Sequence, residues 1–109
     1  MIVNVCPAAD SKASPDRIWE ELTATDRLDQ WVDGRVVGAE PPGVARPGQV
    51  IHLVTPALGR DWPVTIDIVD IDPARRWIDM VVRLPLGIEN HEHITLTERP
   101  DRGTLVRFN

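Results

Sequence analysis

The chain has 109 residues, of which 42% are hydrophobic and 27% charged, and these values are typical of one globular domain. Its formal net charge of −5 argues against nucleic acids and anionic membranes as partners, because both attract proteins with a surplus of Lys and Arg. Cys6 is the single cysteine, so the chain has no internal disulfide. No apolar run approaches the ~20 residues of a membrane span, and the N-terminus lacks a signal-peptide pattern. We therefore expect a cytoplasmic protein.

The first predicted elements are a strand and a helix. Ile2–Cys6 is short and rich in β-formers, and it reads as the first strand. Ser14 and Pro15 then begin a helix, because serine is a good N-cap and proline suits the first helical position. The apolar side of this helix carries Ile18, Trp19 and Leu22.

A second short helix follows at once. Thr25 or Asp26 opens it, and Gly34 ends it. Its apolar side carries Leu28, Trp31 and Val32. Both predicted helices are short, so each can cover only part of a sheet.

Beyond Gly34 the hydrophobic period changes from helical to alternating, which predicts strands. The predicted strands are Arg35–Ala39, Val50–Thr55, Trp62–Ile71, Arg76–Leu84, Asn90–Thr97 and Thr104–Phe108. Gly- and Pro-rich turns separate them, and these connections are too short for crossover helices, so the strands must pair antiparallel. The sequence therefore predicts one α+β domain over residues 1–109, an antiparallel sheet of six to seven strands with two short helices after strand 1.

The alternation also assigns side chains to the two faces of the sheet. One face is mostly apolar and carries Trp62, Val64, Ile66, Ile68, Ile78, Met80, Val82, Leu84, Ile94, Leu96, Val106 and Phe108. The opposite face is mostly polar. A sheet of this kind has to bury its apolar face against something, and two short helices are not enough to cover it.

The order of these elements resembles the START and polyketide-cyclase/dehydratase (SRPBCC) superfamily, which has the helix-grip fold. The resemblance rests on Ser14-Pro15, Arg17–Leu22, Asp29–Trp31, Pro47-Gly48, Gly59–Trp62, Val69–Arg76 and Gly103–Val106. It implies a hydrophobic cavity between a curved sheet and a long C-terminal helix, and members that bind lipids, sterols, polyketides or hormones. Here the last predicted strand runs to the end of the chain, without a long C-terminal helix.

A ligand pocket is expected on the apolar, concave face. The predicted lining residues are Trp31, Trp62, Ile66, Met80, Ile94 and Phe108. Trp77 has the opposite strand parity and is expected on the outer face or at a contact surface. No motif for a nucleotide cofactor, a nucleophilic serine or thiol redox chemistry occurs, so no cofactor is predicted.

Two residues are candidates for acid–base chemistry. Glu92 shares the parity of Ile94 and Leu96, and an inward carboxylate among apolar side chains could donate or accept a proton, as a cyclase or dehydratase requires. The alternative places it at the strand end, in water or paired with arginine. His52 enters the cavity if Val50 and Val54 face inward, and faces outward if Ile51, Leu53 and Thr55 do.

His91 and His93 share one face of a strand, and Glu89 has the parity to add a third metal ligand. Because that face is the polar one, we interpret the histidines as solvated strand residues and predict no metal site.

The sequence thus favours a domain that binds a small hydrophobic ligand, with or without cyclase or dehydratase activity. The alternative is a non-catalytic interaction module, whose apolar sheet face is covered by a partner chain or a second copy. In a homodimer the interface is expected to include the predicted strand Ile78–Leu84 or Thr104–Phe108.

Overall fold

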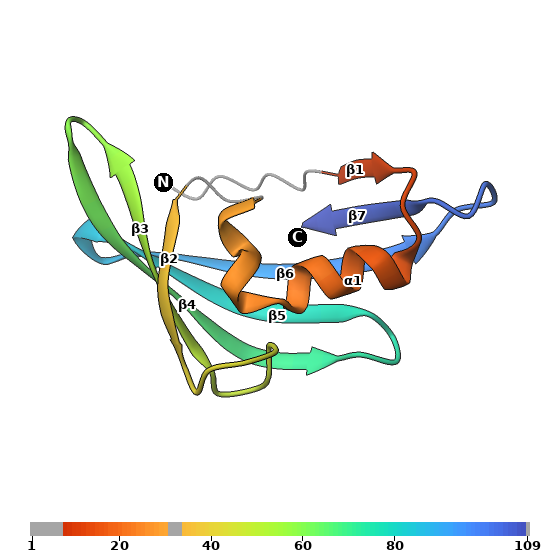
Figure 1. The fold of residues 1–109 in the computed structure, drawn as a ribbon, viewed down its shortest axis with the longest axis horizontal. Coiled ribbons are helices and arrows are strands. Elements are labelled where there is room, and N and C mark those ends of the chain that lie inside the picture. The colour runs from red at the N-terminus through yellow and green to blue at the C-terminus, as the bar shows by residue number, and fades with distance from the viewer. Residues whose placement is uncertain (1–7, 31–33, 109) are drawn as a thin grey trace.

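The structure of the protein, a computed structural model, describes residues 8–30 and 34–108. Its centre is a seven-stranded antiparallel sheet in the order β1-β7-β6-β5-β4-β3-β2 (Figure 1). The strands are β1 (Ala8–Ser11), β2 (Arg35–Glu40), β3 (Val50–Ala57), β4 (Arg60–Asp72), β5 (Trp77–Leu84), β6 (Ile88–Glu98) and β7 (Thr104–Phe108). The helices are α1 (Pro15–Thr23) and the 3-10 helices η1 (Thr25–Gln30) and η2 (Pro85–Gly87).

This architecture confirms the predicted α+β sheet and its two N-terminal helices. The predicted first strand, Ile2–Cys6, lies outside the described residues, as do Trp31 and Val32. Among the described residues, Ala8–Ser11 forms the strand that pairs with β7, and Ala9 lies opposite Val106.

Helix α1 begins where the sequence predicts. The Ser14 side chain accepts a hydrogen bond from the backbone N–H of Arg17 at 3.3 Å, and Pro15 occupies the first turn. The helix ends where the Ala24 N–H donates to the Glu20 carbonyl at 3.1 Å. Leu22 on this helix and Leu28 on η1 are buried in the core, so both helices bury their apolar side against the sheet.

The sheet face toward α1 and η1, here called the inner face, carries the core. Its buried strand residues are Ile51, Leu53, Val64, Ile66, Ile68, Ile78, Met80, Ile94, Leu96 and Val106. This confirms the predicted faces of β4, β5 and β6. A bulge between Ile68 and Asp70 breaks the alternation in β4, leaves Val69 exposed and returns Ile71 to the inner face opposite Ile78.

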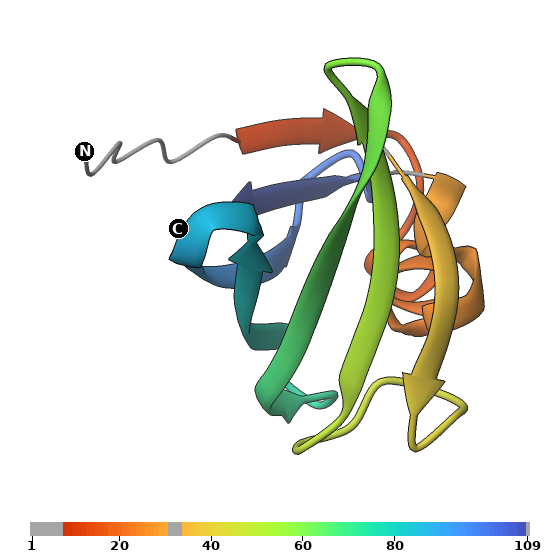
Figure 2. The ribbon, with the colours of Figure 1, turned by 90° about the vertical axis from the view of Figure 1, so that its left-hand side faces the viewer.

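The helices cover only part of the inner face. Helix α1 packs against β6 and η1 against β2, and Figure 1 shows the β3–β4 hairpin and the η2 turn extending well beyond both. Figure 2 shows both helices on one side of the curved sheet. Leu84 and Ile88, which pair across β5 and β6 at the uncovered end, are 38% and 54% exposed. The expectation that the helices are too short to cover the sheet is therefore confirmed.

Gly103 allows the close approach of β1 to the β6–β7 hairpin. A Cβ atom at Gly103 would lie 2.4 Å from the Ser11 carbonyl oxygen, so Gly103→Ala should push β1 away and lower the free energy of unfolding by about 1–3 kcal/mol. Gly38→Ala is the matched control, because a Cβ there meets nothing within 4 Å, and its effect should stay within about 0.5 kcal/mol. Urea unfolding of both variants measures this, and equal losses would contradict the close-approach argument.

Candidate functional site

The uncovered end of the inner face forms the candidate site. The register of β5 and β6 identifies its residues, because Leu84 pairs with Ile88, Val82 with Asn90 and Met80 with Glu92. Strand alternation places all of these side chains on the same side of the sheet. The site, here called the open inner face, consists of Trp62, Val82, Leu84, Ile88, Asn90 and Glu92. Each of them is half-buried or exposed, whereas Met80, the cross-strand partner of Glu92, is buried.

Glu92 stands at the boundary between the open and covered parts of this face. It pairs with buried Met80 and precedes fully buried Ile94 by two residues on the same strand. Asn90 Nδ2 donates a hydrogen bond to Glu92 Oε1 at 3.1 Å. Burial raises the pKa of the Glu92 carboxyl, because the charged form loses hydration beside apolar side chains. None of the ion pairs among residues 8–30 and 34–108 includes Glu92.

Trp62 marks the far end of the open inner face, at the β3–β4 hairpin. Its Nε1 donates to the Ala57 carbonyl at 2.9 Å, and the guanidinium of Arg60 lies 4.0 Å from the centre of its ring. The hydrogen bond and the stacked arginine hold the indole in place. Trp77, in contrast, lies on the outer face, where its ring centre is 5.4 Å from that of His93.

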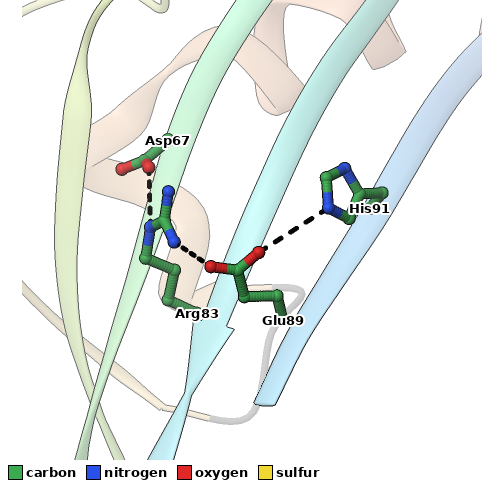
Figure 3. Close-up of polar contacts among 4 residues, drawn as sticks. All are labelled: Asp67, Arg83, Glu89 and His91. Carbon is green, nitrogen blue, oxygen red and sulfur yellow. Dashed lines mark hydrogen bonds and ion pairs between the residues drawn. The ribbon is translucent and has the colours of Figure 1, made fainter. Parts of the chain in front are cut away.

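The outer face is polar, and several of its charges are paired across strands. Arg83 on β5 joins Asp67 on β4, at 2.9 Å, to Glu89 on β6, and Glu89 Oε2 lies 3.8 Å from His91 Nε2 (Figure 3). His93 contacts Asp79 on β5. The part of the chain that the structure describes contains no group of three His, Cys, Asp or Glu residues arranged to hold a metal ion.

The two predicted acid–base residues lie on opposite faces. Ile51 and Leu53 face inward and are 1% and 4% exposed, so the alternative in which His52 faces outward is the one observed. His52 Nε2 lies 3.9 Å from Glu40 Oε2 on the edge strand β2. Glu92 and His52 therefore do not share one site, and the catalytic role of each stays a prediction.

The predicted pocket residues divide into two groups. Trp62 and Phe108 are half-buried on the inner face, but Ile66, Met80 and Ile94 are buried members of the core. Trp31 lies outside the described residues. The sequence interpretation missed Val82, Leu84, Ile88 and Asn90 as site residues. Parity gave the face of three of them, but Ile88 was left outside the predicted strands. Parity also cannot reveal which end of a face the helices leave open.

A shallow depression of about 230 Å³ lies elsewhere, on the outer side of the β2–β3–β4 end. Its lining residues are Gly34, Arg35, Val54, Pro56 and Asp61. None of them is a predicted site residue. Arg35 and Asp61 are both exposed, and we assign no function to this depression.

Comparison with known proteins supports the fold and leaves the family open. No family model matches the chain, and no curated protein matches it either. Among solved structures, the crystal structure of Ara h 8.0201 is similar with a TM-score of 0.70 at 18% sequence identity, and the alignment covers 95% of this chain and 72% of that one. The chain thus has the helix-grip fold of the Bet v 1-like type. In the described residues, no helix is long and apolar enough to span a membrane.

The environment of Glu92 predicts a pH dependence of stability. The folded state binds the proton of the Glu92 carboxyl more tightly than the unfolded state does. The contribution of Glu92 to the free energy of unfolding therefore falls as the pH rises from the unfolded-state pKa of ~4.3 through the higher folded-state pKa. Glu92→Gln should therefore gain free energy of unfolding, relative to the unmodified protein, between pH 4 and pH 7. Urea unfolding at both values measures the gain.

Leu96→Val is the matched control on the same strand. It truncates a buried side chain without altering an ionisable group, so its loss of stability should be the same at both pH values. A Glu92→Gln difference that is also independent of pH would contradict the burial of the carboxylate.

Proposed function

We propose that this domain binds a small hydrophobic ligand, such as a lipid, polyketide or aromatic compound, on the open inner face. The observation that carries the proposal is the exposure of Leu84 and Ile88 on the same sheet face as the buried core. Large apolar side chains that lie together at an uncovered end are a sign of a binding surface. The Bet v 1-like fold, which commonly binds hydrophobic ligands, supports the same proposal.

Catalysis in the manner of a cyclase or dehydratase is a further part of this proposal, and Glu92 is the residue that would perform it. Burial raises the pKa of the Glu92 carboxyl, and a carboxyl in such a position beside an apolar ligand can donate or accept a proton. The first test of the proposal is nevertheless binding, because binding precedes any reaction.

The test compares two tryptophans on opposite faces. N-phenyl-1-naphthylamine, a fluorescent probe that is uncharged at neutral pH, should bind the protein and gain fluorescence. Trp62→Ala should weaken its binding by about tenfold, because a buried aromatic contact contributes roughly 1–2 kcal/mol, and Trp77→Ala should leave it unchanged. Equal effects of the two substitutions, or no binding to the unmodified protein, would contradict the proposal.

The second candidate is a homodimer in which another copy covers the same face. The exposure of Leu84, at the end of the predicted interface strand, favours it. Sedimentation at micromolar concentration separates the two candidates. The ligand proposal expects a monomer that stays monomeric with the probe bound, whereas a dimer that the probe dissociates would favour the second copy.

A further inference from the structure

Charge is distributed very unevenly over the inner face. The inward-facing positions of β5, β6 and β7 include two carboxylates, Glu92 and Glu98, and neither Lys, Arg nor His among the described residues. On β3 and β4 the one basic residue with this parity is Arg60, at the hairpin tip. Among the described strand residues, Glu92 therefore has no basic side chain beside it on the inner face.

Arg60 is too far away to neutralise Glu92. Glu92 lies in the same row as Ile68 and Met80, and eight residues of β4 separate Arg60 from Ile68, or about 26 Å along the strand. Surface charges at that separation are screened, since the Debye length is about 8 Å at physiological salt. The Arg60 guanidinium also already lies over the ring of Trp62.

Helix α1, which packs against β6, supplies no counter-ion either. Its charged residues form other pairs, because Asp16 contacts Arg76 and Arg17 lies 3.7 Å from Glu21. Glu20 is exposed and carries the same sign of charge as Glu92. The one polar contact of the Glu92 carboxylate among the described residues is the neutral amide of Asn90.

We propose that the open inner face selects hydrophobic ligands that carry a basic nitrogen, and that Glu92 is the counter-ion of that group. The inference rests on the proposed function and adds the class of ligand. The apolar part of the ligand would cover Val82, Leu84 and Ile88, and its ammonium group would approach Glu92 at the covered end. A cation there would make a charge-assisted hydrogen bond to the Glu92 carboxylate, whereas a ligand carboxylate would place a like charge beside it.

Three probes with the same apolar chain test this inference: decylamine, decanol and decanoate. Each is titrated against N-phenyl-1-naphthylamine bound to the protein at pH 7, and its displacement gives a Kd. The amine should bind at least about tenfold more tightly than the alcohol, because hydrogen bonds to charged groups are the stronger ones, and decanoate should bind most weakly.

Glu92→Gln should bring the amine Kd to within about twofold of the alcohol Kd and leave the alcohol Kd unchanged. The matched control is Glu98→Gln, which removes the other inward-facing carboxylate of β6, and it should preserve the preference for the amine. Preservation of the preference in Glu92→Gln, or tightest binding of decanoate, would overturn the inference. Failure of decanol to displace the fluorescent probe would instead count against the proposed function itself.

Discussion

The burial of one apolar sheet face is the constraint on which the rest of this molecule depends. Alternating strands place nearly all large aliphatic side chains on the inner face, and α1 and η1 cover only part of that face. The covered part of the face is a close-packed core around Ile51, Ile78 and Ile94. The uncovered part leaves Leu84 and Ile88 38% and 54% exposed, so each would gain only about 0.5–1.5 kcal/mol from complete burial. That unrealised burial is a driving force for binding.

Carboxylates on the two faces differ in their partners, and this difference determines the chemistry of the candidate site. On the outer face Arg83 lies between two carboxylates, and each histidine has a carboxylate neighbour. Such pairs are exposed and contribute little to stability. On the inner face Glu92 has a neutral hydrogen-bond partner and reduced hydration. An interaction with its charge is therefore stronger there than one on the outer face.

The sequence predicts the order of the elements and most of the face assignments, because a period of two and a Ser-Pro helix start are local signals. The sequence does not predict the bulge between Ile68 and Asp70, because no particular residue type marks the position of the extra residue in the strand. The face of His52 stayed open because Val50, Ile51, Leu53 and Val54 are all apolar, so both parities are compatible with burial.

The location of the site was harder to predict than the face that carries it. Parity placed Ile94 and Phe108 on the inner face, yet the position of α1 decides that Ile94 is buried while Leu84 is open. Helix position depends on long-range packing that strand periodicity does not encode. Ile88 was missed because β6 begins directly after η2, and no residue after the Pro-Leu-Gly turn marks the first position of the strand.

Methyl NMR during titration with N-phenyl-1-naphthylamine tests the account most directly. Val82 and Val54 form a matched pair, because both are half-buried strand valines on opposite faces of the sheet. If the open inner face is the binding site, the methyl resonances of Val82, Leu84 and Ile88 should shift while those of Val54 stay in place. Shifts at Val54 without shifts at Val82 would assign binding to the outer depression and contradict the account.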